Sequence, residues 1–220
     1  MDWQELINKR HTTFAWEDTV PERETIQAVL EELYMHVPSK NLQFPWSIYV
    51  YRNNNFEIQK EIMTICHRNR ERDINIDKGN PQVLAPWIIA FTNRWVKDLE
   101  RRYEKTSDRP DFAQRDSEQI EIGIVALFLA LAFANRGIQS GFCQNILNNQ
   151  TRAKEIFKVA PDHEVRFIMG VGYGKSSDTL HTYIDPRTGN EKLIPFIPDN
   201  VERPYPRPAF ESIFNFVGEN

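Results

Sequence analysis

The sequence predicts an α+β fold in which a central mixed sheet is covered by helices on both faces. Runs rich in β-branched and aromatic residues alternate with amphipathic segments, and one run, residues 122–134, is apolar on every side. Strands separated by helices form a sheet covered on both faces, and a helix that is apolar all round must lie in the core. With 220 residues and 40% apolar side chains, we expect residues 1–220 to form a single domain.

The first part of the chain is expected to supply two helices, a strand and a third helix. Residues 3–10 are amphipathic, and Pro21 suits the first turn of a helix at 22–35 whose apolar residues share one face. β-branched and aromatic residues predict a strand at 47–51. Apolar residues at near-helical spacing predict the next helix at 56–72.

A buried strand and a surface segment are expected in the middle of the chain. Residues 83–91 are almost all apolar, and Pro86 marks where regular pairing begins. The charged residues 94–105 predict a helix, and the polar residues 106–116 predict a loop. We therefore expect residues 92–117 to form a surface excursion or a lid.

The last part of the chain combines the clearest helix with an extended arm. Residues 118–136 form that helix, and Gly137 stops it. Residues 145–160 are amphipathic and helical, and residues 164–173 form a further strand. The tail, residues 194–220, holds five prolines between residues 194 and 208 and ends in an apolar piece, so we expect it to dock on a partner subunit.

Composition and charge exclude several classes of protein. A net charge of −4 argues against a nucleic-acid binder. Cys66 and Cys143 have no CxxC partner and cannot form a secreted disulfide framework, which indicates a reducing compartment. The acidic N-terminus is unlike a signal peptide, and the longest apolar run is shorter than the ~20 residues that span a bilayer. We expect a cytoplasmic protein that binds neither nucleic acid nor membrane.

Familiar catalytic motifs are absent from the sequence. The glycines at 170–174 miss the spacing of a phosphate-binding loop by one position. In residues 137–141 the serine, Ser140, and a spacer residue are exchanged relative to the GxSxG nucleophile elbow. The histidines show no metal-ligand spacing. We therefore expect no metal site and no nucleophilic side chain.

Two segments near the N-terminus indicate a nucleotide-like cofactor. Residues 9–13, Lys-Arg-His-Thr-Thr, gather cations and hydroxyls, which are the groups that bind a phosphate monoester. Residues 38–46 place small and amide side chains before an aromatic one, which suits the edge of a flat heteroaromatic ring. Taken singly, each segment could instead be an exposed helix end or an ordinary loop.

The chain resembles the FMN-dependent nitroreductase family in four segments that occur in the family's order: residues 10–16, 38–46, 132–140 and 168–173. The resemblance covers nearly the whole chain, although each motif is loose. Two positions depart from it. Phe14 stands where the family often has a basic residue, and Phe44 is inserted between glutamine and proline.

The resemblance implies an α+β homodimer with FMN in two interfacial sites. It implies that NAD(P)H reduces the flavin and that a nitroaromatic or quinone acceptor reoxidises it in a second, ping-pong half-reaction. The flavin performs the chemistry, so no catalytic side chain is expected. Residues from the 94–116 segment, together with Phe142, would form the wall of the acceptor pocket.

The resemblance also assigns cofactor contacts residue by residue. These are the phosphate-binding residues Arg10, His11, Thr12 and Arg207, the flavin-edge residues Ser39, Asn41 and Gln43, the ribityl and N1/C2 residues Asn69 and Arg72, and Gln144 and Asn145, which fall where the family places a backbone amide near N5. A cation at N1/C2 stabilises the reduced flavin, and a donor at N5 orients the ring.

Two alternatives to a nitroreductase activity remain open. The same FMN scaffold could serve a dehydrogenation, a dehalogenation or flavin destruction. A dimeric interaction module that has lost its flavin is the other alternative, and Phe14 is the residue that makes it conceivable.

Overall fold

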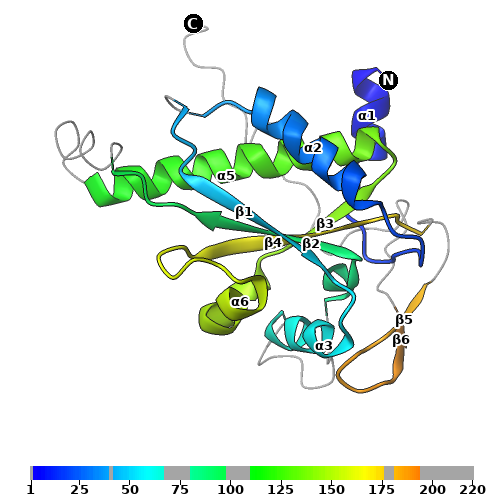
Figure 1. Cartoon of the computed structure of the whole chain (residues 1–220). Coiled ribbons are helices and arrows are strands. Elements are labelled where there is room, and N and C mark those ends of the chain that lie inside the picture. Colours follow the sequence, from blue (N-terminus) through cyan, green and yellow to red (C-terminus); the bar gives the residue numbers. More distant parts are fainter. Residues whose placement is uncertain (1, 40–41, 67–79, 98–109, 176–180, 194–220) are drawn as a thin grey trace, which may run out of the picture.

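The computed structural model of the chain describes residues 2–39, 42–66, 80–97, 110–175 and 181–193 (Figure 1). Its elements are, in chain order, α1 (Trp3–Lys9), α2 (Arg23–His36), β1 (Trp46–Arg52), α3 (Phe56–Ile65), η2 (Pro81–Leu84), β2 (Trp87–Asn93), α5 (Pro110–Asn135), β3 (Gln139–Cys143), η3 (Asn145–Asn149), α6 (Gln150–Phe157), β4 (Val165–Gly172), β5 (Thr182–Ile184) and β6 (Glu191–Leu193).

Four strands form the central sheet in the order β1-β2-β4-β3, and each neighbouring pair is antiparallel. Ile89 of β2 lies opposite Val50 on one side and Met169 on the other. Among the described residues, the parallel pairing expected of a mixed sheet is confined to an isolated bridge between Thr12 and Ser140. A separate hairpin consists of β5 and β6.

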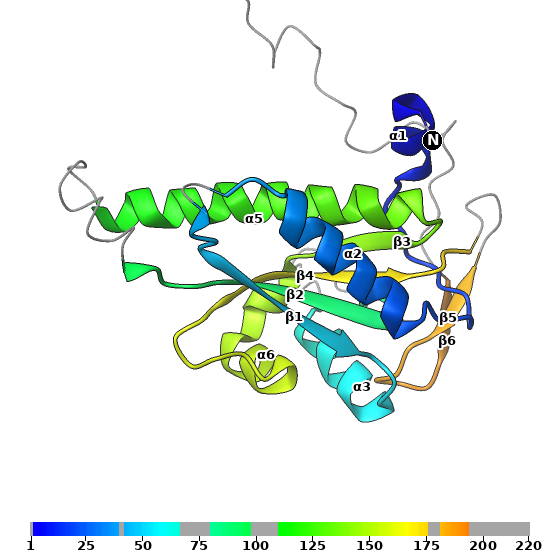
Figure 2. The same cartoon turned by 45° about the horizontal axis from the view of Figure 1, so that its top comes forward.

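Helices cover both faces of the sheet, as the sequence predicted (Figures 1 and 2). Along β2, Ile89 and Phe91 pack against α2 and α5, whereas Ile88 and Ala90 pack against α3 and α6. This alternation follows from the two-residue period of a strand. Every residue of β2 is buried, which explains its continuous apolar sequence.

α5 is the helix that the sequence identified most clearly, and it is longer than expected. It begins at Pro110, so the residues from 110 to 116, predicted to be a loop, are helical. Among the described residues, α5 also contains the one stretch, residues 115–135, that is long and apolar enough to cross a membrane. Because Val125, Leu129 and Phe133 of this stretch are fully buried against the sheet, α5 is a core helix.

The strand expected at 83–91 starts later than predicted. Residues 81–84 form the 3-10 helix η2, and β2 begins at Trp87, directly after Pro86. Proline has no N–H to donate to a neighbouring strand, so regular pairing starts after it. Arg94, Trp95 and Val96 are not helical, and the rest of the helix expected at 94–105 lies outside the described residues apart from Lys97.

Two further differences concern the second half of the chain. β3 was not predicted, because Gln139, Ser140 and Gly141 have low strand propensity and only pairing with β4 makes them a strand. The single helix expected at 145–160 is divided into η3 and α6. The division falls at Asn149, whose side chain accepts a hydrogen bond from the Arg152 N–H and caps α6.

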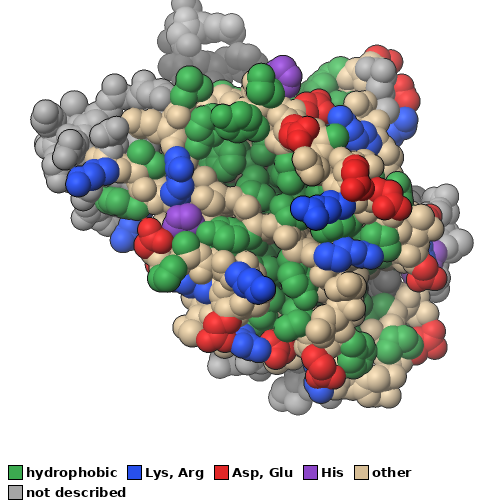
Figure 3. All heavy atoms as spheres, viewed as in Figure 1, with side chains coloured by type: hydrophobic (Ala, Val, Ile, Leu, Met, Phe, Trp, Pro, Cys, Tyr) green, Lys and Arg blue, Asp and Glu red, His purple; other side chains and the backbone are tan. Residues whose placement is uncertain are grey.

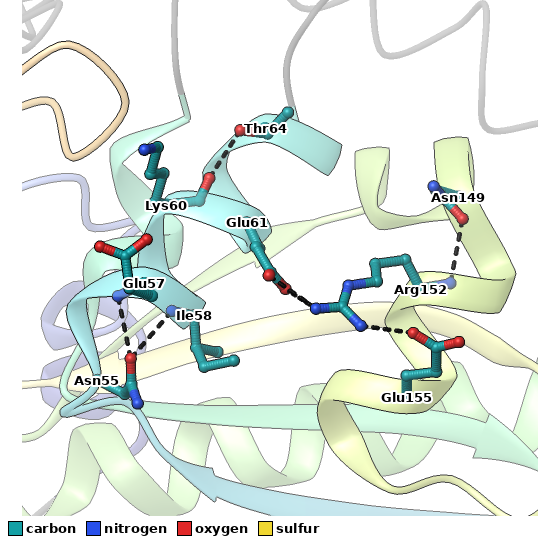
Figure 4. Close-up of polar contacts among 9 residues, drawn as sticks. All are labelled: Asn55, Glu57, Ile58, Lys60, Glu61, Thr64, Asn149, Arg152 and Glu155. Atoms are coloured by element: carbon teal, nitrogen blue, oxygen red, sulfur yellow. Dashed lines mark hydrogen bonds and ion pairs between the residues drawn. The ribbon is translucent and has the colours of Figure 1, made fainter.

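α3 and α6, which cover the face of the sheet opposite α2 and α5, are joined by a cluster of charged side chains (Figure 4). The Arg152 guanidinium of α6 lies 2.5 Å from Glu61 of α3 and 2.5 Å from Glu155 of its own helix. Asn55 caps the other end of α3 by accepting from the N–H groups of Glu57 and Ile58. These contacts tie α3 to α6 and cap the N-terminal end of α3.

The predicted excursion and arm are described only in part. Thr92 and Asn93 at the start of the 92–117 excursion are buried in β2, and its end belongs to α5. Residues 98–109 between them lie outside the described residues, as do residues 194–220 of the expected arm and residues 67–72 of the expected third helix. The lid and the docking of the arm stay predictions.

Candidate functional site

The segment that follows α1 lies along one edge of the sheet. Thr12 forms a parallel bridge with Ser140 of β3, and the Thr13 N–H donates to the Ser140 carbonyl at 3.1 Å. Four residues later, Trp16 forms an antiparallel bridge with Gly174, just beyond β4. The sequence motif at 10–13 is therefore held in place by backbone pairing to the sheet.

Two glycines permit this close approach. A Cβ atom on Gly141 would lie 2.6 Å from the Thr13 carbonyl oxygen, which is closer than real Cβ atoms come to other atoms. A Cβ atom on Gly174 would lie 3.0 Å from the side chains of Thr13 and Gln139. The edge of the sheet is thus shaped to accept the segment that carries the predicted phosphate-binding residues.

The predicted phosphate-binding residues Arg10, His11 and Thr12 follow the end of α1. Arg10 caps α1 with its backbone N–H. Its guanidinium is half-buried and makes no hydrogen bond or ion pair to the described residues. Thr12 is exposed, and its hydroxyl has no partner in the described part of the chain. His11 is exposed and directs Nδ1 at the Lys9 carbonyl at 3.2 Å. A cation and a hydroxyl are thus available to bind an anion.

Buried polar atoms accompany this segment. Thr13 Oγ1 and Gln139 Oε1 are inaccessible to solvent and have no hydrogen-bond partner among the described residues, and both side chains adjoin Gly174. An unpaired buried polar atom costs about 1–3 kcal/mol. The Thr13 hydroxyl can donate a hydrogen bond and, together with the uncommitted donors of Arg10 and Thr12, fits the phosphate end of a nucleotide cofactor, whereas Gln139 Oε1 can only accept.

The loop after α2, which carries the predicted flavin-edge residues Ser39 and Gln43, is held in an unusual conformation. Ser39 Oγ accepts a hydrogen bond from the Phe44 N–H at 2.9 Å, and the Arg94 guanidinium donates to the carbonyls of Gln43 and Phe44. Leu42 and Phe44 adopt positive φ angles of 56° and 46°. Such strain persists only where surrounding contacts enforce it, and it often marks functional loops.

The inserted Phe44 has a packing role. Its ring stacks on Tyr34 at 6.0 Å between centroids and meets Trp46 edge-on at 5.5 Å. It also packs against the core formed by α2, α5 and the sheet. The insertion therefore anchors the loop, while Gln43 Oε1 and Trp46 Nε1 remain buried without a partner among the described residues.

Gln144 and Asn145, the predicted N5 residues, lie at the end of β3. Gln144 is exposed, and its side chain has no partner in the described residues. The Asn145 side chain instead donates to the Cys66 carbonyl at 3.2 Å and so holds the end of α3. Of the two side chains, the one that can approach a ligand is that of Gln144.

The structure brings some predicted residues together and separates others. Thr12 pairs with Ser140, and β3 extends from there by about 10 Å to Cys143, directly before Gln144. In both views the loop with Ser39 and Gln43 lies towards the N-terminal end of α5, whereas α1 and β3 lie near the C-terminal end of α5 (Figures 1 and 2). One chain therefore does not bring this loop to the N-terminal segment. The predicted residues that lie outside the described residues are Asn41, Asn69, Arg72 and Arg207.

Several positioning residues were missed from the sequence. Thr13, Gly141 and Arg94 orient the two predicted segments, yet none was selected as a site residue. Thr13 sits within the selected motif, so its neighbours could have indicated it. The roles of Gly141 and Arg94 depend on contacts with residues far away in the chain, for which the sequence carries no local signal.

A cavity of about 470 Å³ lies between the N-terminal segment, the β1–α3 connection and the β5–β6 hairpin. Its walls include Phe14, Trp16, Arg52, Lys175 and Tyr183, and none of the predicted site residues that the structure describes lines it. Phe14, which stands where the family often has a basic residue, lines this cavity. Acidic, basic and aromatic side chains are mixed in its walls, and no single ligand class follows from them.

Comparison with known proteins gives a consistent result. The sequence model of the Nitroreductase family matches residues 7–173, so the β5–β6 hairpin lies beyond the match. No curated protein sequence matches the chain.

Solved structures share the fold at low sequence identity. A nitroreductase family protein from Clostridium novyi NT has a TM-score of 0.60 and 18% identity, with 80% of this chain and 87% of that chain covered. A Nitroreductase Family Protein from Streptococcus pneumoniae TIGR4 has a TM-score of 0.58 and 21% identity, with 80% and 92% covered. The NADPH:FMN oxidoreductase from Vibrio harveyi, complexed with NAD+, has a TM-score of 0.60 and 15% identity, with 82% and 72% covered.

Proposed function

Because the chain belongs to the nitroreductase family, we propose that it is an FMN-dependent oxidoreductase that uses NAD(P)H to reduce nitroaromatic or quinone-type acceptors. The observation that carries this proposal is the Arg10–Thr12 segment, whose uncommitted cation and hydroxyl are fixed on β3 beside Gly141. The related fold of an NADPH:FMN oxidoreductase supports the choice of cofactor and electron donor.

The residues divide into those that hold the cofactor and those that shape its surroundings. Arg10 and Thr12 would neutralise and hydrogen-bond the phosphate, with His11 beside them. Gln144 would approach the ring from the end of β3. When bound, FMN supplies the ability to accept hydride from NAD(P)H and pass it to the acceptor.

Phe142 is suited to the wall of the acceptor pocket. It lies on β3, two residues before Gln144, and 38% of its surface is exposed. Phe167 of β4 supports its ring from the side, at 5.8 Å between centroids. A supported, exposed aromatic ring gives an apolar surface against which a flat acceptor can stack.

We further propose that two copies form the complete site. α5 exposes Ile120, Ile124 and Leu127 at helical spacing, and Figure 3 shows hydrophobic side chains gathered at the top of the molecule over α2 and α5. Exposed apolar residues grouped in this way are typical of an interface. A second copy would also supply the Ser39 and Gln43 loop, which one chain keeps away from its own Arg10 segment.

The binding test uses FMN retention by purified full-length protein. The protein is incubated with excess FMN, passed through a gel-filtration column and examined for flavin absorbance. We expect Arg10→Ala to weaken FMN binding about 10- to 150-fold, because hydrogen bonds to a charged group contribute about 1.5–3 kcal/mol. Lys9→Ala is the matched control, since Lys9 already pairs with Glu5 at 2.8 Å. Wild-type protein that retains no flavin would favour the interaction module instead.

The activity test follows NADPH or NADH consumption by the FMN-loaded protein. Nitrofurazone and menadione represent the two acceptor classes, and we expect both to accelerate the consumption above its rate without acceptor. Loaded protein that leaves both rates at background would reject the reductase proposal. The other reactions of the FMN scaffold would then be the remaining candidates.

A further inference from the structure

Arg94 contacts three successive carbonyl groups of the loop after α2. Its backbone N–H donates to the Pro45 carbonyl at 2.9 Å, its Nη2 to the Gln43 carbonyl at 2.7 Å, and its Nε to the Phe44 carbonyl at 3.1 Å. Arg94 directly follows β2, so the sheet fixes the position of its backbone. A guanidinium is rigid and planar, and it holds the two carbonyls that it contacts in one orientation. Arg94 therefore fixes the backbone of the loop just before β1.

Side-chain packing explains only part of the conformation of this loop. Leu42 and Phe44 both have positive φ angles, which cost free energy in residues that carry a side chain. The Phe44 ring packs against Tyr34 and Trp46, but 76% of the surface of Leu42 is exposed. Because Leu42 gains little from packing, hydrogen bonds of the loop backbone must offset its strain. Arg94 donates three of these bonds.

The positive charge of Arg94 has no counter-charge among the described residues. Arg94 is exposed, and its guanidinium donates to uncharged carbonyls. Other arginines differ in this respect, since Arg136 pairs with Glu32 and Arg152 pairs with Glu61. Arg94 therefore adds a positive charge to the loop that carries the predicted flavin-edge residues.

Building on the proposed FMN-dependent function, we propose that Arg94 is a positioning residue whose charge raises the affinity of the loop with Ser39 and Gln43 for reduced FMN relative to oxidised FMN. A hydride from NAD(P)H adds one negative charge to the flavin ring, and a cation near the N1/C2 edge stabilises that charge. The resemblance assigned such a cation to Arg72, and Arg94 is a second one. In the two-copy site, Arg94 acts on the flavin held by the Arg10 segment of the other copy.

The test measures the dissociation constants of oxidised and reduced FMN for the full-length protein. Oxidised FMN is titrated by its own fluorescence, and FMN reduced with dithionite is titrated without oxygen by tryptophan fluorescence. We expect Arg94→Gln to weaken the binding of reduced FMN about 10-fold more than that of oxidised FMN, because one charge is removed from a partly screened site. Arg94→Lys keeps the charge and should restore most of the wild-type ratio of the two constants. Equal weakening of both forms in Arg94→Gln would overturn the proposal.

Arg23→Gln is the matched control, because it removes the same charge from an exposed residue at the other end of α2. We expect it to leave the ratio of the two dissociation constants at the wild-type value. The same ratio in Arg94→Gln and Arg23→Gln, with FMN still bound by the wild type, would reject the role of Arg94 and leave the proposed function standing. Wild-type protein that binds FMN in neither form would reject both.

A measurement on the wild-type protein tests the same charge. Salt screens exposed charges, so the wild-type ratio should fall as sodium chloride is raised from about 50 mM to about 500 mM, and it should fall less in Arg94→Gln. A ratio that does not respond to salt would contradict the proposal.

Hydrogen exchange reports the fixing of the loop separately, without flavin. The Phe44 amide, which donates to Ser39 Oγ, should exchange faster in Arg94→Gln and in Arg94→Lys, since neither side chain has the two-pronged geometry of arginine. Unchanged exchange in both variants would show that Arg94 does not position the loop.

Discussion

Gly141 shows how a single residue controls the position of the candidate site. Its missing side chain leaves room for the Thr13 carbonyl, and this contact places Arg10 and Thr12 against β3. A side chain at this position would meet backbone, which cannot rotate away as a flexible side chain can. The proposed function of the Arg10 motif therefore depends on a residue that itself carries no functional group.

We expect Gly141→Ala to displace the N-terminal segment. The added methyl group would lie 2.6 Å from the Thr13 carbonyl oxygen, and overpacking of this kind costs about 1–3 kcal/mol. Thermal unfolding should show the loss of stability, and FMN retention should fall with it. The neighbouring change Ser140→Ala removes a hydroxyl but keeps the backbone pairing, so it should leave FMN retention near the wild-type value. Equal retention by Gly141→Ala and Ser140→Ala would contradict the proposed role of the close contact.

At the scale of elements, short polar contacts fix segments that propensity alone leaves undecided. β3 becomes a strand because β4 offers a pairing edge, and the β5–β6 hairpin is closed around a buried carboxylate. Asp185 is fully buried, and it lies 2.7 Å from the Arg187 guanidinium and 2.8 Å from the Lys192 ammonium. The hairpin is therefore expected to depend on the charge of one side chain.

This dependence gives a prediction about pH. Burial by itself would raise the pKa of Asp185, but hydrogen bonds from Arg187 and Lys192 outweigh burial and lower the pKa well below its usual range. A group with a lowered pKa stabilises the folded state above its unfolded value of about 3.9, and this contribution is lost as the pH falls towards the folded pKa. Amide protection in residues 182–193 should therefore fall below about pH 4 relative to β2. In Asp185→Asn this selective loss should vanish, and its persistence there would contradict the assignment.

At the scale of the whole molecule, α5 has two different faces. Leu129 is fully buried between the sheet and α2, whereas 54% of the surface of Leu127 is exposed. The buried face holds one chain together, and the exposed face is available to a second copy. The two roles can be separated by substitutions only two positions apart.

We expect Leu129→Ala to destabilise the folded chain by about 2–5 kcal/mol, because it leaves a cavity in the core. Leu127→Glu should change the unfolding of the single chain little but should shift sedimentation from dimer to monomer. Thr151→Glu adds the same charge on exposed α6, across the sheet, and should leave the dimer intact. A wild-type chain that sediments as a monomer at all concentrations would reject the dimer.

The sequence predicted best those elements that depend on interactions between residues close together in the chain. The helices α1 and α2 and the strand β1 were predicted within one or two residues, because periodicity and proline signals are local. The start of α5, the strand β3 and the division of η3 from α6 were not. The strand β3 depends on its distant partner β4, and the division of η3 from α6 depends on the Asn149 cap.

The sequence by itself determined the class of fold and the central helix, because residue type and spacing encode burial and charge directly, and it predicted the Arg10 and Ser39 segments as the cofactor site. Only the tertiary structure decided that Gly141 seats the first segment on β3, that Arg94 holds the second, and that Cys66 and Cys143 lie in the same buried cluster. These facts depend on contacts between residues far apart in the chain, and such contacts exist only once the sheet has paired and its helices have packed.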